Sequence, residues 1–122
     1  MPIRVLIADD AVFMRNMIRD IFSSNGDFEV IGEAANGEEA ITKYADLKPD
    51  VVTMDIVMPV KSGIEAVKEI CRKDSKARIV MCSALGQESL VMEAIEAGAS
   101  DFIVKPFTPE KVLEVVRKIA AL

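Results

Sequence analysis

The sequence contains no histidine. This absence excludes Ser-His and Cys-His catalysis, histidine-ligated zinc, and any phosphohistidine formed within the chain. Cysteine is scarce as well. Cys71 and Cys82 lack CxxC spacing and lie in apolar stretches, so we expect buried, reduced thiols and neither a disulfide nor a metal site. Any chemistry of this chain must therefore use carboxylates, lysine and hydroxyl groups.

Long apolar runs and basic clusters are also missing. No run approaches the roughly 20 apolar residues that span a bilayer, and residues 1–4 lack a basic-then-apolar signal segment. We therefore expect a cytoplasmic protein without membrane contact. The net charge of −5 argues against nucleic-acid binding. Apolar residues make up 51% of the 122, which predicts one folded domain over residues 1–122.

Short β-branched runs alternate with segments of helical spacing along the whole chain. The runs cover residues 3–8, 28–31, 51–54, 78–82 and 102–104. The segments between them carry apolar residues on one stripe, which is typical of helices that pack on a core. Five strands and five helices predict an α/β fold, a single doubly wound (βα)5 domain with a parallel sheet. Fold rules favour the flavodoxin-like strand order 2-1-3-4-5.

Polar residues and glycines mark the expected helix ends. Asn36 and Ser62 each precede a glutamate by three residues, as in an N-terminal capping box. Thr108, followed by proline, predicts the start of the last helix. Gly26 and Gly98 lie where helix C-terminal glycines are expected.

Four ionisable residues follow predicted strands: Asp9 and Asp10 the first, Asp55 the third and Lys105 the fifth. Parallel strands end at one edge of a sheet, so three carboxylates and one ammonium should meet there. Singly, Asp10 could be a helix cap, Asp55 a turn residue and Lys105 a surface charge. Together they predict a site for a divalent metal and a phosphoryl group, with Mg²⁺ expected and Mn²⁺ as an alternative. A carboxylate beside such a metal can attack phosphorus.

Other residues follow strands at the same edge. Ser83 ends the fourth strand and precedes Ala84, and its hydroxyl could reach a phosphoryl group, although such hydroxyls more often stabilise turns. The bond between Lys105 and Pro106 is a candidate cis peptide. Residue chemistry alone predicts that Phe102 is a plain core residue.

In their order and spacing, these motifs resemble the receiver domain of two-component response regulators over essentially the whole chain. The motifs are Asp9-Asp10, the segment from Asp55 through Met58-Pro59 to Gly63, Ser83-Ala84, and Lys105-Pro106-Phe107. No single motif is specific, but the ordered set is. Residues 8–15 are most similar to the chemotaxis, CheY-like branch of that family.

The resemblance implies a role for each residue of the cluster. Asp55 would take the phosphoryl group from a phosphohistidine of a partner kinase. Mg²⁺ would be held by Asp10, Asp55 and the backbone carbonyl of Val57, with Asp9 acting mainly through water. Lys105 would pair with the phosphoryl group that arrives.

The resemblance also implies a switch and a set of partners. Ser83, with Ala84 beside it, would bind the phosphoryl group, and Phe102 takes the position of an aromatic switch that swings inward. Phe102 lacks the hydroxyl of the tyrosine found in many relatives. The expected partners of this monomer are a CheA-like histidine kinase and a separate phosphatase. A FliM-like flagellar switch protein would bind the fourth helix, fifth strand and fifth helix.

Two apolar residues depart from the family pattern. Val57 and Leu85 stand two residues beyond Asp55 and Ser83, where many relatives carry polar groups that contact the hydrolytic water. We therefore predict slow self-dephosphorylation and reliance on the phosphatase. Lys61 also replaces the usual apolar residue before the Ser62-Gly63 turn, and sequence alone assigns it no effect.

Other functions share parts of this pattern. A haloacid-dehalogenase-like phosphatase would carry its two acids two residues apart after the first strand, whereas here they are adjacent. A flavodoxin-type flavin binder would need a hydroxyl-rich phosphate loop where Asp9 and Asp10 stand. The complete acidic set opposes a scaffold that cannot be phosphorylated. A receiver fragment, or a phosphorelay intermediate outside chemotaxis, stays open. We expect a stand-alone chemotaxis regulator that turns over no external substrate.

Overall fold

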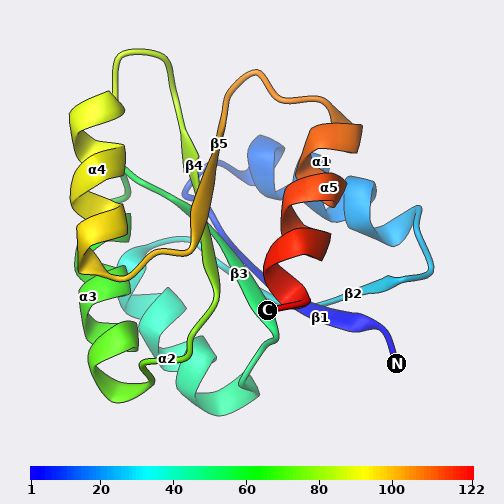
Figure 1. The fold of residues 1–122 in the computed structure, drawn as a ribbon, viewed down its shortest axis with the longest axis horizontal. Coiled ribbons are helices and arrows are strands. Elements are labelled where there is room, and N and C mark those ends of the chain that lie inside the picture. Colours follow the sequence, from blue (N-terminus) through cyan, green and yellow to red (C-terminus); the bar gives the residue numbers. More distant parts are fainter.

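The computed structural model describes all 122 residues, and strands and helices alternate along the chain (Figure 1). The strands are β1 Ile3–Ala8, β2 Phe28–Ala34, β3 Val51–Asp55, β4 Ile79–Ser83 and β5 Asp101–Val104. The helices are α1 Val12–Ser23, α2 Gly37–Leu47, α3 Gly63–Lys73, α4 Glu88–Ala97 and α5 Pro109–Ala120. The predicted five strands and five helices are therefore confirmed.

The five strands form one parallel sheet in the order β2-β1-β3-β4-β5. This confirms the predicted fold class and strand order. The chain reverses its direction of travel across the sheet between β1 and β3, which is where open α/β sheets form a crevice. Ala8 is paired with Met54, so the residues that follow them, Asp9 and Asp55, become neighbours at that crevice.

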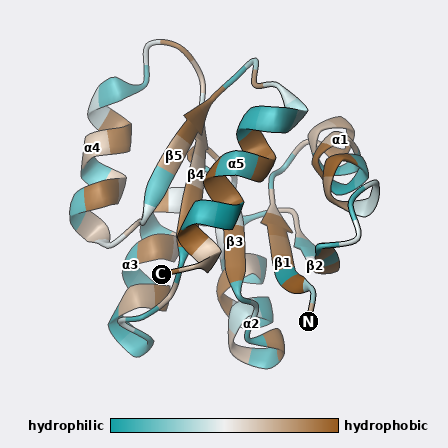
Figure 2. Ribbon diagram, turned by 45° about the vertical axis from the view of Figure 1, so that its right-hand side comes forward, coloured by the Kyte–Doolittle hydropathy of each residue, from teal (hydrophilic) through white to brown (hydrophobic).

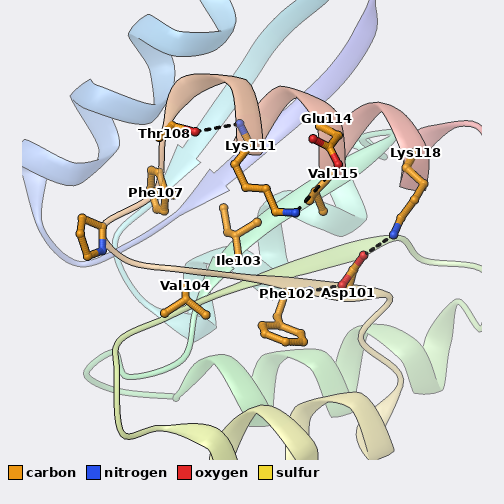
Figure 3. Close-up of a pocket in the computed structure, with 11 residues that line it drawn as sticks. Asp101, Phe102, Ile103, Val104, Phe107, Thr108, Lys111, Glu114, Val115 and Lys118 are labelled. Carbon is orange, nitrogen blue, oxygen red and sulfur yellow. Dashed lines mark hydrogen bonds and ion pairs between the residues drawn. The ribbon is translucent and has the colours of Figure 1, made fainter.

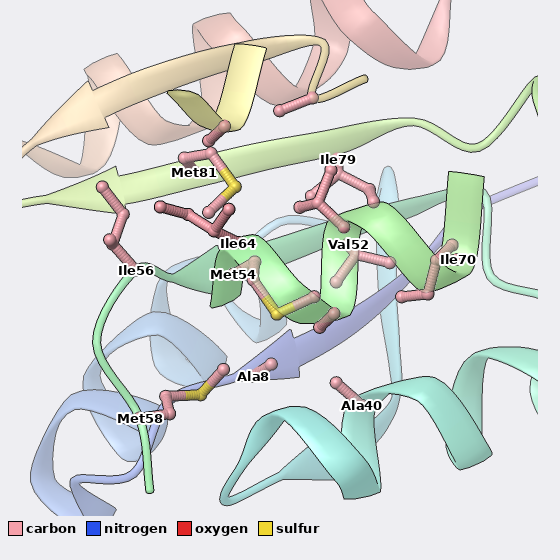
Figure 4. Packing of buried hydrophobic residues seen from close by; sticks show 14 of the residues in the cluster. Ala8, Ala40, Val52, Met54, Ile56, Met58, Ile64, Ile70, Ile79 and Met81 are labelled. Atoms are coloured by element: carbon pink, nitrogen blue, oxygen red, sulfur yellow. The ribbon is translucent and has the colours of Figure 1, made fainter. Parts of the chain in front are cut away.

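Helices cover both faces of the sheet. Helices α1 and α5 lie on one face, and α2, α3 and α4 lie on the other (Figures 1 and 2). Alternate strand residues supply the two cores: Leu6 and Met54 pack toward α2 and α3, whereas Val5 and Ile7 pack toward α1. Figure 4 shows the larger core, where methionine and isoleucine side chains of β3 and β4 meet those of α3. No helix combines the length and apolar character needed to cross a bilayer.

Most helix ends follow the predicted capping residues. Asn36, Ser62 and Thr108 each accept a backbone N–H of the helix that follows, and Gly98 ends α4 at a positive φ of 123°. The prediction for Gly26 is wrong. Helix α1 already ends at Ser23, three residues before Gly26; the C-cap residue is Ser24, in a right-handed conformation, so no left-handed glycine ends this helix.

Strand β2 runs to Ala34, beyond the predicted limit at residue 31. Its last residues, Gly32 to Ala34, carry no β-branched side chain and gave no strand signal, but they pair with β1. A register shift between Val5 and Leu6 accommodates the extra residue of β2. Both cysteines are free; Cys82 is buried as expected, but Cys71 is only half-buried.

Candidate functional site

The carboxylates of Asp9, Asp10 and Asp55 meet at the C-terminal edge of the sheet. One oxygen of each lies within 4.8 Å of the others. The three differ in environment, since Asp9 is buried, Asp55 is partly buried and Asp10 is exposed. The strand ends therefore bring together the three acids that the sequence separates by up to 46 positions.

Lys105 reaches the same cluster from the end of β5. Its Nζ lies 3.4 Å from Oδ1 of Asp55 and 3.5 Å from Oδ2 of Asp9. Its backbone N–H donates to the carbonyl of Ser83 over 2.7 Å, and the bond to Pro106 is cis. The ammonium is thus paired with two of the three carboxylates, and the cluster carries excess negative charge.

Asp9 has one satisfied and one unsatisfied oxygen. Oδ1 accepts the N–H of Ala11 over 2.9 Å. Oδ2 is buried and has no hydrogen bond, only the ion pair to Lys105. The alternative reading of Asp10 as the cap of α1 is not supported, because α1 begins after Ala11 without any side-chain cap. A buried carboxylate oxygen without a donor, beside two further carboxylates, is a donor set that fits Mg²⁺.

The cluster changes the acidity of Asp55. Burial and the adjacent charge of Asp9 raise its pKa from 3.8 to about 6. The Lys105 charge and the N–H of Ile56, which donates to Oδ1 over 3.0 Å, offset only part of this. Burial also lowers the pKa of Lys105, but the charges of Asp55 and Asp9 outweigh it and the net pKa shift is upward. Lys105 therefore stays charged.

Gly63 allows the segment after Asp55 to fold back on the strand. Its N–H donates to the carbonyl of Ile56 over 2.8 Å. A Cβ at this position would lie 2.0 Å from the Asp55 carbonyl oxygen, so any larger residue would displace the backbone at the site.

Arg15 is a residue of the site that sequence reasoning missed. Its guanidinium donates to the carbonyl of Asp9 over 2.7 Å and to Glu33 of β2 over 3.2 Å. Glu33 is also paired with Arg19 over 3.1 Å. Arg15 therefore ties the loop after β1 to the edge strand. The contact had no signal in the sequence, because Arg15 and Glu33 are brought together only by the fold.

Ser83 and Phe102 lie side by side near the cluster. Ser83 is buried, and its hydroxyl donates to the Ile103 carbonyl over a long 3.4 Å. Phe102 is 42% exposed, so the prediction of a plain core residue is wrong. On edge strand β5, Ile103 points into the core and Phe102 points to the opposite, incompletely covered face. There it lines a cavity of about 260 Å³ together with Ser83 and Met92.

The largest cavity lies away from the acidic cluster. It is a groove of about 610 Å³ between β5 and α5 (Figure 3). Its rim is charged, with Lys118 of α5 paired to Asp101 over 3.0 Å, whereas Ile103 and Val115 lie at its base. A mixed, open groove of this kind suits a protein segment better than a small reactant.

Comparison with known proteins identifies the family. The response regulator receiver domain matches residues 5–117. The chemotaxis protein CheY of Thermotoga maritima is 58% identical over 96% of this chain and 97% of its own length. CheY of Bacillus subtilis is 59% identical, over 94% of this chain and 95% of its own. In the solved CheX–CheY–BeF3–Mg²⁺ complex from Borrelia burgdorferi, one chain shares 45% identity at a TM-score of 0.91, covering 98% of this chain and 90% of that one. The resemblance inferred from the motifs is confirmed: the chain belongs to the response regulator receiver domain family.

Proposed function

We propose that residues 1–122 form a stand-alone receiver in which Asp55 accepts a phosphoryl group from a histidine kinase in a Mg²⁺-dependent reaction. The observation that carries this proposal is the position of Asp55, whose partly buried carboxylate lies beside that of Asp9 and 3.4 Å from the Lys105 ammonium. The high identity to CheY proteins over nearly the whole chain favours a role in chemotaxis, in control of the flagellar motor. The same relatives favour a regulator that turns over no external substrate.

The transfer needs an ionised carboxylate as the nucleophile and a phosphohistidine as the phosphoryl donor. Because this chain contains no histidine, the donor must be another protein. An oxygen of Asp55 attacks the phosphorus of the kinase phosphohistidine, the P–O bond forms, and the P–N bond breaks. The electron pair of that bond stays on the imidazole nitrogen of the kinase histidine, and the imidazole takes up a proton from solvent. Because the pKa of Asp55 is about 6, the attacking carboxylate is largely ionised at pH 7 and above. Lys105 then pairs with an oxygen of the new phosphoryl group.

The acids have separate tasks toward the metal. Asp10, Asp55 and the backbone carbonyl of Val57 would hold Mg²⁺ directly, and Asp9 would act mainly through water. Mn²⁺, which shares the preference for oxygen ligands, is the alternative ion. When bound, the ion neutralises charge on the phosphoryl oxygens. The exposed carboxylate of Asp10 supports direct contact with the ion, and the buried Oδ2 of Asp9, which no hydrogen bond satisfies, supports contact through a water that donates to it.

The readout would begin at Ser83. Its hydroxyl, with the backbone beside it at Ala84, turns from the Ile103 carbonyl to the phosphoryl group, and Phe102 moves into the adjacent cavity. The surface of α4, β5 and α5, including the groove of Figure 3, would then bind a FliM-like switch protein or another target. The donor would be a CheA-like kinase, and the regulator would act as a monomer in the cytoplasm.

The phosphoryl group is expected to be long-lived. Val57 and Leu85 are 57% and 79% exposed, and both offer apolar side chains at the rim of the site. Neither can orient a hydrolytic water, so a separate phosphatase would end the signal. A relative of this chain does bind a second protein: the solved structure from Borrelia burgdorferi is a complex of CheY with CheX.

The proposal is tested by incubating the protein with Mg²⁺ and an acyl phosphate, with intact mass as the readout. We expect one phosphoryl group on the wild type and none on Asp55→Asn or in the presence of a chelator. Asp46→Asn, which removes the same charge from an exposed position of α2, should still be modified. Modification of Asp55→Asn, or no modification of the wild type, would refute the assignment.

A further inference from the structure

Lys61, in the loop between β3 and α3, joins three parts of the fold. Its Nζ lies 2.8 Å from Glu69 of α3 and 3.2 Å from Glu38 of α2. Its carbonyl accepts the N–H of Gly37, the first residue of α2, over 2.8 Å. A Cβ on Gly37 would lie 2.3 Å from that carbonyl oxygen, so the close approach requires glycine. We call these contacts the Lys61 clamp.

The residue before the clamp has a strained backbone. Val60 has a φ of +68°, a value that β-branched residues rarely adopt. The N–H of Lys61 donates to the carbonyl of Pro59 over 2.8 Å, so Val60 is the central residue of a γ-turn of the rarer, positive-φ form. Its side chain is 77% exposed and cannot hold this conformation by packing. The neighbours of Val60 must therefore hold it.

The strained turn belongs to the loop that leaves Asp55. The base of the loop is closed where Gly63 donates to Ile56, beside the nucleophile. Val57, whose carbonyl is the proposed metal ligand, lies between that closure and the turn. The clamp holds the far end of the same loop against α2 and α3. Release of the far end would let the turn relax and shift the Val57 carbonyl.

We propose that Lys61 is a positioning residue: the clamp holds the strained loop in the geometry that binds Mg²⁺. This inference rests on the function proposed above and adds a residue that contacts neither the metal nor the phosphoryl group. It also gives a physical role to the departure from the family pattern at this position, where a charged residue replaces an apolar one.

The direction in which Lys61→Met changes the Kd for Mg²⁺ distinguishes a positioning role of Lys61 from a purely electrostatic one. Lys61→Met keeps the apolar stem and removes a positive charge. Electrostatics alone would then tighten binding of a cation. Loss of positioning would weaken it. Each exposed ion pair shifts an equilibrium by a factor of up to about five, so we expect the Kd for Mg²⁺ to rise about three- to tenfold.

The experiment titrates Mg²⁺ calorimetrically into wild type, Lys61→Met, Lys61→Arg and Lys68→Met. Lys61→Arg should stay within about twofold of the wild type, because a guanidinium can span both glutamates. Lys68 is an exposed lysine of α3 outside the clamp, so its replacement reports the charge effect alone. An unchanged or lower Kd for Lys61→Met overturns the proposal. Absence of Mg²⁺ binding by the wild type would instead refute the proposed function.

A metal-free readout tests the same proposal independently. Amide hydrogen exchange of Gly37 and Gly63, which report the two ends of the loop, should be faster in Lys61→Met than in the wild type by a similar factor. Val60→Gly removes the strain at the turn. In that background Lys61→Met should change the Kd for Mg²⁺ by less than about twofold. Equal effects in both backgrounds would show that Lys61 does not act through the strained turn.

Discussion

Asp55→Asn should stabilise the protein in the absence of divalent metal, although it removes the proposed nucleophile. The rise in the pKa of Asp55 from 3.8 to about 6 means that the folded protein destabilises the ionised carboxylate. Each pKa unit corresponds to about 1.4 kcal/mol, which gives an upper limit of about 3 kcal/mol. The carboxylate is still 14% exposed, so solvent screening reduces the expected gain to about 1–2 kcal/mol. Asparagine is neutral and keeps an oxygen for the Ile56 N–H.

The pH dependence has a definite sign. Because the folded-state pKa is the higher one, the folded protein binds this proton more tightly than the unfolded chain does. The loss of stability caused by ionised Asp55 is therefore absent below about pH 4, grows between pH 4 and pH 6, and is complete above about pH 7. The advantage of Asp55→Asn in the free energy of unfolding should follow the same curve.

Urea unfolding with a chelator at pH 5 and pH 8 measures this difference, and Asp46→Asn is the matched charge control. Added Mg²⁺ should stabilise the wild type more than Asp55→Asn and narrow the gap. A variant Asp55→Asn no more stable than the wild type at pH 8 would refute this explanation. An advantage of Asp55→Asn as large at pH 5 as at pH 8 would refute it as well.

Three further predictions concern the loop, the phosphoryl group and a contact between helices. Val60→Gly should raise the free energy of unfolding by about 0.5–1 kcal/mol in urea denaturation, because relief of the positive φ outweighs the entropy of glycine; a loss of stability would contradict the strained turn. Phosphorylated Asp55 should decay over minutes or longer after donor removal, and a half-life of seconds would show that apolar Val57 does not slow hydrolysis. Tyr44→Phe should cost about 1 kcal/mol at neutral pH, because the hydroxyl donates to Asp74 over 2.7 Å. This bond lowers the pKa of Asp74, so the cost should shrink in acid, and a pH-independent cost would exclude that contact as its source.

The parts of the fold that sequence predicts are those that depend on local pattern. Continuous apolar runs and apolar residues at helical spacing predict the strands and helices, and parallel pairing brings Asp9, Asp55 and Lys105 to one edge of the sheet whatever the loops do. The remaining features depend on contacts between distant residues. Arg15 contacts Glu33 only after β1 and β2 pair, and no local sequence pattern around either residue predicts this ion pair. The same holds for the half-exposed position of Phe102, which follows from the edge location of β5.

Lys61 illustrates the same limit in the loop. Its departure from the family pattern is visible in the sequence, but its partners are not. Glu38 and Glu69 belong to different helices, and the contact exists because α2 packs its N-terminus against the loop carbonyl. The positive φ of Val60 is equally hidden, since a β-branched residue predicts the opposite conformation. The backbone strain at Val60 and the Lys61 contacts that restrain it therefore exist only in the folded loop.

For the switch proposed above, phenylalanine at position 102, where many relatives carry tyrosine, has an energetic consequence. Moving a two-state switch from 1:99 to 99:1 takes about 5.5 kcal/mol. Burial of the 42% of Phe102 that is now exposed, about 80 Å², would favour the inward state by about 2 kcal/mol with or without the phosphoryl group. The roughly 5.5 kcal/mol that phosphorylation itself must supply falls within the range of two charge-assisted hydrogen bonds, from Ser83 and Lys105 to the phosphoryl group. The long bond that Ser83 gives up costs little. Because the Phe102 ring carries no hydroxyl, its inward position would leave no polar group of the ring to satisfy, and ring burial would favour that position without a hydrogen-bond partner.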